Sequence, residues 1–150
     1  MPQVKNIPST DHVESTTRPA DGLLDGPLTQ EDREDFRALV RSFTAKEISP
    51  YINAWEAEGG IPRELYTKAG DIGLLGIGLP EQYGGLGPDT AMLRFTLGQE
   101  LACAGSGGLV NALVGSFYIS QPPIARLGSV GLQARILPET ISGRLIGPWP

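Results

Sequence analysis

The sequence from Ala69 to Gly87 reads A-G-D-I-G-L-L-G-I-G-L-P-E-Q-Y-G-G-L-G, and this stretch decides the fold of the chain. No single helix can span it, because each glycine weakens a helix by about 1 kcal/mol relative to alanine and proline does so by about 3 kcal/mol. Apolar residues alternate with the glycines, which indicates a packed segment: Ile72, Leu74, Leu75, Ile77 and Leu79. We expect a helix that ends near Gly73, then a buried extended strap, then a turn at Glu81 to Gly85.

A glycine-rich stretch between helices is also typical of phosphate-binding loops. The order G-x-G-x-x-G is absent from this stretch, however, and no Gly-Lys-Ser or Gly-Lys-Thr follows it. The glycines therefore favour tight turns and close packing of the backbone.

The residue totals exclude several classes of protein. A length of 150 residues suits one domain, and a formal charge of −5 with scattered basic residues gives no footprint for nucleic acid or an anionic membrane. The only histidine, His12, lies in a polar stretch, which argues against a histidine triad or a multi-histidine metal site. Cys103 is the only cysteine and sits in an apolar run, so we expect a buried side chain and no internal disulfide. No apolar run is long enough to span a membrane and no signal peptide is recognisable, so we expect a cytoplasmic protein.

The N-terminal part of the chain divides into a polar tail and a first helical region. Residues 1–26 are too polar to offset the loss of chain entropy, and we expect them to be disordered. Thr29 is a good helix N-cap, and apolar residues then recur at helical spacing: Phe36, Leu39, Val40 and Phe43. The helical pattern continues to Trp55, with a kink or restart at Pro50, and Gly59-Gly60 ends it.

Helical signals also fill the part of the chain that follows. Pro62 suits the first position of a short helix, whose buried edge we expect to be formed by Ile61, Leu65, Ala69 and Ile72. Asp89 is a candidate cap for a helix to about Ala104. This helix is apolar on most faces, so we expect it to be buried on most faces.

Gly-Ser-Gly-Gly at residues 105–108 breaks the chain again. Leu109 to Ile119 is then almost wholly apolar, as in a core helix or the wall of an apolar pocket. Pro122-Pro123 predicts the start of another short helix, and Ser129 caps a last helix that Gly143 closes. Strand patterns are missing from the sequence. The sequence therefore predicts an all-α bundle of about six helical segments.

Several of these segments resemble one known family when they are read in order. They are P-R-E-L-Y-T-K-A-G from Pro62, G-L-L-G-I-G-L-P-E-Q-Y-G-G from Gly73, Q-E-L-A from Gln99, G-S-G-G from Gly105, P-P-I-A-R-L-G-S from Pro122 and I-L-P-E-T-I-S-G from Ile136. Together they are similar to the N-terminal α-domain of the flavin-dependent acyl-CoA dehydrogenases. The resemblance covers roughly Leu28 to Gly147 and divides the chain into a tail (1–26), a helical domain (27–147) and an atypical end (148–150).

The resemblance implies a role in the oxidation of the Cα–Cβ bond of an acyl-CoA thioester. In the family, FAD is held largely by a β-domain, and a C-terminal helical domain supplies the catalytic glutamate. Neither domain follows here, so we expect no catalytic residue and no bound FAD in this chain alone. The family continues with a T-E-P-G-x-G-S-D-like segment where this chain has Pro148-Trp149-Pro150. A frameshifted or truncated gene is the hypothesis that this difference favours, and resequencing would test it.

The family's helix beside the acyl chain corresponds to Leu109 through Ile119. By that match Asn111, Ala112, Gly115 and Ile119 would face the acyl tail of the substrate, with Gly115 leaving room for it. An apolar helix suits such a wall, although the same residues also suit a plain hydrophobic core.

Two functional interpretations remain open. In the first, the chain is the substrate-side domain of an acyl-CoA dehydrogenase that needs the remaining domains. In the second, it is a non-catalytic helical module that binds an acyl group or a protein. Glu100 is a candidate general base in the first, but a lone carboxylate fits a structural salt bridge better. The first interpretation predicts an exposed apolar patch and self-association of the chain, because two helices are apolar nearly all round and the remaining domains would supply part of their cover. A monodisperse monomer that binds no ANS would favour the second.

Overall fold

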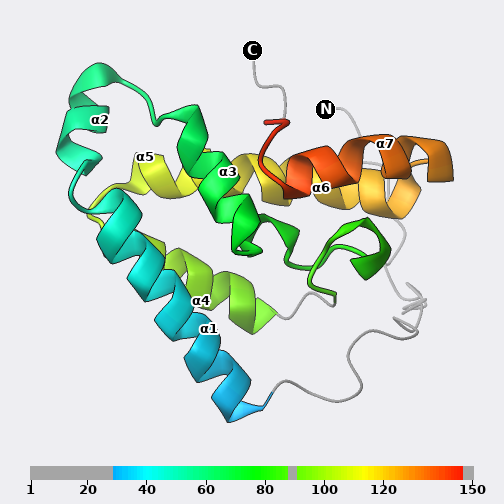
Figure 1. The fold of residues 1–150 in the computed structure, drawn as a ribbon, viewed down its shortest axis with the longest axis horizontal. Coiled ribbons are helices and arrows are strands. Elements are labelled where there is room, and N and C mark those ends of the chain that lie inside the picture. Colours follow the sequence, from blue (N-terminus) through cyan, green and yellow to red (C-terminus); the bar gives the residue numbers. More distant parts are fainter. Residues whose placement is uncertain (1–28, 88–90, 147–150) are drawn as a thin grey trace, which may run out of the picture.

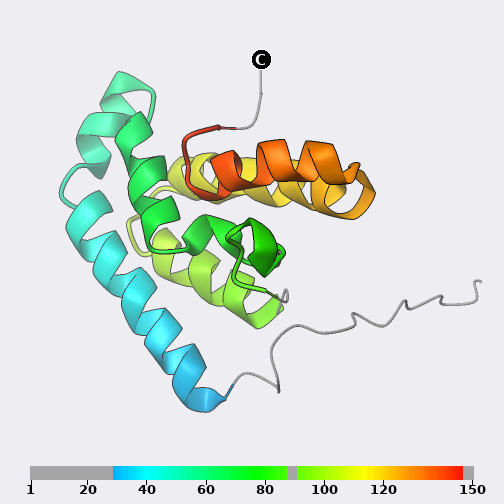
Figure 2. The same cartoon turned by 45° about the vertical axis from the view of Figure 1, so that its right-hand side comes forward.

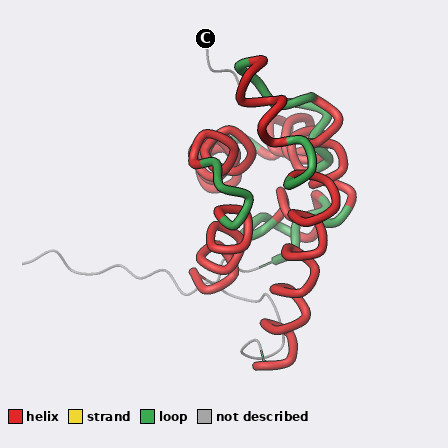
Figure 3. Tube along the Cα trace, turned by 90° about the vertical axis from the view of Figure 1, so that its left-hand side faces the viewer, coloured by secondary structure: helices red, strands yellow, loops and turns green. Residues whose placement is uncertain are grey.

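The computed structural model describes residues 29–87 and 91–146. In order, its α-helices are α1 (Gln30–Phe43), α2 (Ile52–Glu58), α3 (Arg63–Asp71), α4 (Ala91–Ala102), α5 (Gly107–Val110), α6 (Ser116–Leu127) and α7 (Val130–Ile141). A π-helical turn, Asn111–Gly115, joins α5 to α6 without a break. The described residues thus form six helical segments and no strand, which confirms the predicted all-α fold (Figure 3).

The helices pack as two pairs with the glycine-rich strap and α3 between them. Helix α1 lies along α4, and α6 lies along α7 (Figure 1). The turned view shows α3 and the strap filling the space between these pairs (Figure 2). The strap contacts α3 on one side and α7 on the other, so it links the two halves of the domain.

The first helical region begins and ends where its local signals predicted. The Thr29 hydroxyl accepts a hydrogen bond from the Asp32 amide at 3.1 Å, and the Asp32 carboxylate accepts one from the Thr29 amide at 2.9 Å. This reciprocal capping box fixes the start of α1. A second π-helical turn, Thr44–Ile48, precedes Pro50, and the chain restarts as α2, as predicted. Gly59 ends α2 with a left-handed φ of 78°.

The strap differs from the predicted extended segment, although its ends are as expected. Gly73 follows α3 with a φ of 82°, and Leu74–Gly76 then forms a 3-10 turn. The strap curls because its two ends bond to each other: the Leu86 amide donates to the Gly76 carbonyl at 2.9 Å, and the Gly87 amide donates to the Leu79 carbonyl at 3.0 Å. A Cβ atom on Gly85 would lie 2.1 Å from the Leu79 oxygen, so this glycine serves close backbone packing.

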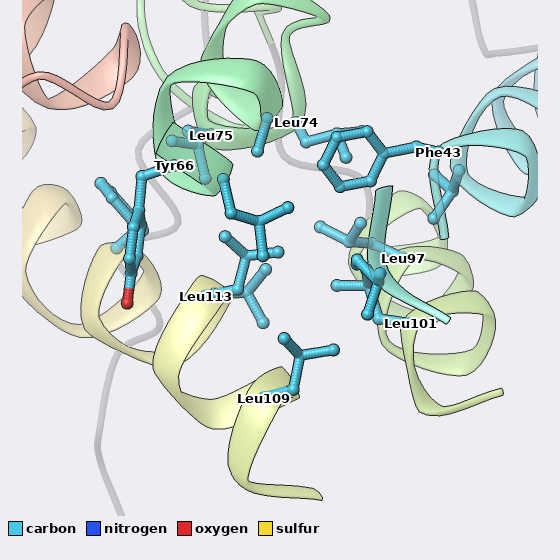
Figure 4. Packing of buried hydrophobic residues seen from close by; sticks show 14 of the residues in the cluster. Phe43, Tyr66, Leu74, Leu75, Leu97, Leu101, Leu109 and Leu113 are labelled. Carbon is cyan, nitrogen blue, oxygen red and sulfur yellow. The ribbon is translucent and has the colours of Figure 1, made fainter. Parts of the chain in front are cut away.

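Leucines from four segments meet in the core beside two aromatic rings (Figure 4). The labelled core residues are Phe43, Tyr66, Leu74, Leu75, Leu97, Leu101, Leu109 and Leu113. Tyr66 stands at the edge of this cluster, where the end of its ring reaches the segment that carries Leu113 (Figure 4).

Helix α4 is less buried than predicted. Leu97 and Leu101 are fully buried, but Phe95 is 61% exposed and Met92 is 48% exposed. The buried residues of α4 all lie along one face of the helix: Leu93, Thr96, Leu97, Glu100 and Leu101. The prediction that Cys103 is buried is also wrong. Cys103 lies in the turn after α4 and faces outward, and its Sγ is 3.4 Å from the Gln99 carbonyl oxygen.

Two predictions about prolines need correction. Pro62 is the residue before the first turn of α3, one position earlier than predicted. Pro122 and Pro123 do not start a helix but lie inside α6, whose packing on α7 outweighs the loss of two backbone donors. The proposed tail at 1–26, the Asp89 cap and the atypical end at 148–150 lie outside the described residues.

Candidate functional site

The continuous helical run from α5 through α6 contains the residues that were predicted to face an acyl chain. Its start is fixed by Ser106, whose hydroxyl oxygen accepts a hydrogen bond from the Leu109 amide at 2.9 Å. The same hydroxyl donates to the carboxylate of Glu56 on α2. Together, the Ser106 cap and its hydrogen bond to Glu56 hold the N-terminal end of this helical run against α2.

The run has one buried and one outward face. Leu109, Leu113 and Phe117 are spaced by four residues and are 2%, 1% and 1% exposed. Asn111, Gly115 and Ile119 keep the same spacing on the other side, where Asn111 is exposed, Gly115 is half-buried and Ile119 is 57% exposed. The outward face of α5–α6, as we call these last three residues, is uncharged, since residues 107–121 contain no Asp, Glu, Lys or Arg.

Ala112 is set apart from the other three predicted site residues. It is half-buried and lines a groove of about 240 Å3 together with Ile52 and Trp55 from α2. The structure therefore brings Asn111, Gly115 and Ile119 onto one face and places Ala112 at its border with α2.

Gly115 does not leave the open space that the sequence suggested. A Cβ atom at this position would lie 2.6 Å from Oδ1 of Asn111, whose side chain folds over the glycine. The Asn111 side chain is exposed and can rotate, so the space near Gly115 is occupied by a movable polar group.

Sequence reasoning missed Tyr66, which contacts this region from α3. Its hydroxyl donates to the Ala112 carbonyl at 3.1 Å, and its ring centroid lies 5.9 Å from that of Phe117. Burial raises the pKa of the Tyr66 phenol, which keeps the hydroxyl protonated and able to donate. A signal for Tyr66 existed, since it lies four residues after Pro62 and next to the predicted buried residue Leu65.

Two further polar features of α6 were also missed. The guanidinium carbon of Arg94 lies 4.4 Å from the ring centroid of Tyr118, a cation–π contact that joins α4 to α6. Gln121 is 2% exposed, and its Nε2 has no hydrogen-bond partner.

Glu100 is a structural residue, as its salt-bridge interpretation predicted. It lies on the α1 side of α4 and pairs with Arg41, whose hydrogen bonds lower the pKa of the Glu100 carboxyl despite its burial. A carboxylate held ionised in this way is a poor proton acceptor. Within the described residues no cluster of His, Cys, Asp and Glu suits a metal ion. None of the helices described is long and apolar enough to cross a membrane.

Comparisons with known proteins agree with this architecture. The family described as "Acyl-CoA dehydrogenase, N-terminal domain" matches residues 30–144. The rat mitochondrial long-chain specific acyl-CoA dehydrogenase is 34% identical over 118 residues, which are 77% of this chain and 26% of that protein. The probable acyl-CoA dehydrogenase YngJ of Bacillus subtilis is 32% identical over 122 residues, covering 81% of this chain and 31% of that protein.

Solved structures show the same relationship. A probable acyl-CoA dehydrogenase from Mycobacterium abscessus is 39% identical with a TM-score of 0.71, over 79% of this chain and 31% of that one. A butyryl-CoA dehydrogenase from Megasphaera elsdenii shares the fold with a TM-score of 0.68. The chain thus spans about a quarter to a third of the length of these relatives. It belongs to the acyl-CoA dehydrogenase family and corresponds to the N-terminal domain of that family.

Proposed function

We propose that this domain forms the acyl-chain side of the substrate site in an FAD-dependent acyl-CoA dehydrogenase. The observation that carries the proposal is the outward face of α5–α6. It is uncharged over two turns and exposed at Asn111 and Ile119, opposite the buried face of Leu109, Leu113 and Phe117. A face of this kind suits contact with a hydrocarbon chain once further domains enclose it.

We propose that the residues described here do not form a flavin site by themselves. Glycine-rich loops bind phosphate through open backbone amides, but two glycines of this region lie tightly against other parts of the backbone. A Cβ atom would lie 2.5 Å from the Ser142 carbonyl carbon at Gly70, in α3, and 2.1 Å from the Leu79 oxygen at Gly85, in the strap. We therefore propose that FAD and the catalytic base belong to the remaining domains of the enzyme. The purified chain should show no flavin absorbance and no reduction of an acceptor dye with acyl-CoA.

A domain transplant tests the proposal directly. Residues 30–144 would replace the matching part of the Mycobacterium abscessus relative, and dye reduction would be measured with butyryl-, octanoyl- and palmitoyl-CoA. We expect an active flavoprotein in which Ile119→Asp raises KM for palmitoyl-CoA by more than about tenfold, because an unpaired carboxylate beside a hydrocarbon chain is costly. Leu127→Asp is the control, since Leu127 is 88% exposed at the end of the same helix. A flavin-loaded transplant in which Ile119→Asp leaves the KM for palmitoyl-CoA unchanged would overturn the proposal.

A non-catalytic module that binds an acyl group or a protein is the second candidate. The exposed side chains of Met92 and Phe95 do not separate the two candidates, because either the remaining domains of an enzyme or the partner of a module could cover them. The two candidates differ in the transplant, since a module that evolved outside an enzyme is not expected to restore activity. A cytoplasmic location remains a prediction for both.

A further inference from the structure

The π-helical turn Asn111–Gly115 has a specific partner outside its own helix. We infer that Tyr66 is a positioning residue, whose hydroxyl holds this turn in register and thereby orients the outward face of α5–α6. The structural part of this inference concerns the chain alone, whereas its relevance to substrate rests on the function proposed above.

The turn is the unusual part of the run, because π-helical hydrogen bonding is rare and occurs mostly as single turns inside α-helices. Its hydrogen bonds run from each carbonyl to the amide five residues on, so the carbonyl ladder is displaced relative to the flanking α-helices. Each carbonyl oxygen has two lone pairs and can accept a second bond. The Tyr66 hydroxyl donates to the carbonyl of Ala112, the second residue of the turn, at 3.1 Å. This hydrogen bond joins the backbone of the π-turn to the side chain of Tyr66 on α3, 46 residues earlier in the chain.

Tyr66 can serve as a fixed reference because contacts hold it at both ends. Its own carbonyl oxygen lies against Gly143, where a Cβ atom would come within 2.1 Å. Its ring packs beside Phe117, and the whole side chain is 7% exposed. The backbone of α3 is thus pressed against the end of α7, while the hydroxyl reaches the π-turn.

The register of the turn decides which side chains face outward. One residue corresponds to about 100° of rotation in an α-helix, so a turn that reverted from π to α would rotate the residues on its two sides relative to each other. Asn111 and Gly115 lie at the two ends of the turn, and the Asn111 amide covers Gly115 in the present register. Loss of the Tyr66 bond should therefore change the environment of the Asn111 amide without any direct contact between the two side chains.

The test is Tyr66→Phe in the full chain, which removes the hydroxyl and keeps the ring. Thr140→Val is the matched control, because the buried Thr140 hydroxyl also donates to a helical carbonyl, that of Leu137, at 3.0 Å. We expect Tyr66→Phe to shift the NMR resonances of the Ala112 carbonyl carbon and the Asn111 side-chain amide. Amide hydrogen exchange over residues 112–118 should become about threefold to tenfold faster, the effect of losing one hydrogen bond. Thr140→Val should leave both observations unchanged.

A response that is equal in both variants, or absent from residues 111–118 in Tyr66→Phe, would overturn the inference. A measurement on the wild-type chain covers the case in which Tyr66→Phe does not fold. With the Ala112 carbonyl labelled, exchange of the Tyr66 hydroxyl proton for deuterium should shift the carbonyl resonance, and no shift would also overturn the inference. These results do not depend on acyl-CoA, so a failure of the domain transplant would refute the proposed function alone. In an active transplant, Tyr66→Phe should raise KM for palmitoyl-CoA more than it lowers kcat.

Discussion

The carboxylate of Glu100 accepts two parallel hydrogen bonds from the guanidinium of Arg41, with Oε2 3.0 Å from Nε and Oε1 3.1 Å from Nη2. Arg37 adds a contact at 3.5 Å. The Glu100 side chain is 8% exposed whereas that of Arg41 is 68% exposed, so the pair joins a buried group on α4 to the surface of α1. Pairing of α1 with α4 therefore depends on charge as well as on the leucines beneath.

This pair makes stability dependent on pH. The Arg41 hydrogen bonds lower the pKa of Glu100 in the folded chain. The stabilisation is therefore complete above the pKa of an unfolded glutamate, about 4.3, and is lost as the pH falls through the lower folded value. Glu100→Gln should cost about 1 kcal/mol at neutral pH, since the exposed Arg41 weakens the pair. Urea denaturation should show that this cost shrinks in acid.

Glu139→Gln is the control for Glu100→Gln. Glu139 also makes two hydrogen bonds to an arginine, Arg144, but its side chain is 47% exposed. Glu139→Gln should therefore lower the free energy of unfolding less than Glu100→Gln does at neutral pH. A Glu100→Gln variant as stable as Glu139→Gln at every pH would contradict the prediction.

Gly143 and Gly131 should respond to alanine in opposite directions. Gly143 has a φ of 73°, and a Cβ atom there would meet the Tyr66 oxygen at 2.1 Å, so Gly143→Ala should cost more than about 2 kcal/mol. Gly131 is inside α7 with no atom within 4 Å of such a Cβ atom, so Gly131→Ala should stabilise by about 0.5–1 kcal/mol. Thermal unfolding of both variants measures the difference, and equal effects would show that Gly143 is not confined by Tyr66.

The buried amide of Gln121 should be replaceable by an apolar group. Its Nε2 has no hydrogen-bond partner, and an unpaired buried donor costs about 1–3 kcal/mol. Gln121→Met should therefore raise the free energy of unfolding of the chain. Gln133→Met should lower it, because the Gln133 Nε2 donates to the carbonyls of Ala125 at 3.1 Å and Gly128 at 2.9 Å. A loss of stability in Gln121→Met would mean that the amide has a partner in solution.

The exposed apolar side chains predict self-association of the isolated chain. Met92 and Phe95 project from α4, and Ile119 projects from α6. Phe95→Lys should lower ANS fluorescence and shift sedimentation towards the monomer, because it places a charge on the patch. Leu127→Lys, at the end of α6, should change ANS fluorescence and sedimentation less than Phe95→Lys does. A wild-type chain that sediments as a monomer without binding ANS would contradict this prediction.

Local signals in the sequence were sufficient to place most helix boundaries. Thr29 and Ser129 cap their helices through their own hydroxyls, and Gly59 and Gly73 adopt the left-handed backbone that ends a helix. These features depend on residues within one turn of each other, so they are visible in the sequence.

Features that depend on tertiary contacts were not predictable in the same way. Pro122 has the local character of a helix start, yet the packing of α6 on α7 keeps the helix continuous through it. The exposure of Phe95 depends on what else covers α4, which its own apolar pattern does not specify. The Tyr66 bond joins residues 46 positions apart, and no short motif encodes it. At the site, the sequence and the family resemblance indicated the helix, but not the register in which its side chains are presented.

The π-turn at Asn111–Gly115 also affects how relatives can be compared with this chain. Such a turn accommodates an extra residue without lengthening the helix by a full α-helical step. A relative whose matching helix is α throughout would stay aligned with this chain on one side of residues 111–115 and slip by one position on the other. Superposing only α6, or only α5, would then assign different equivalents to the same position on the outward face of α5–α6. Transfer of pocket residues between family members should therefore follow the backbone geometry of this segment and not the residue count.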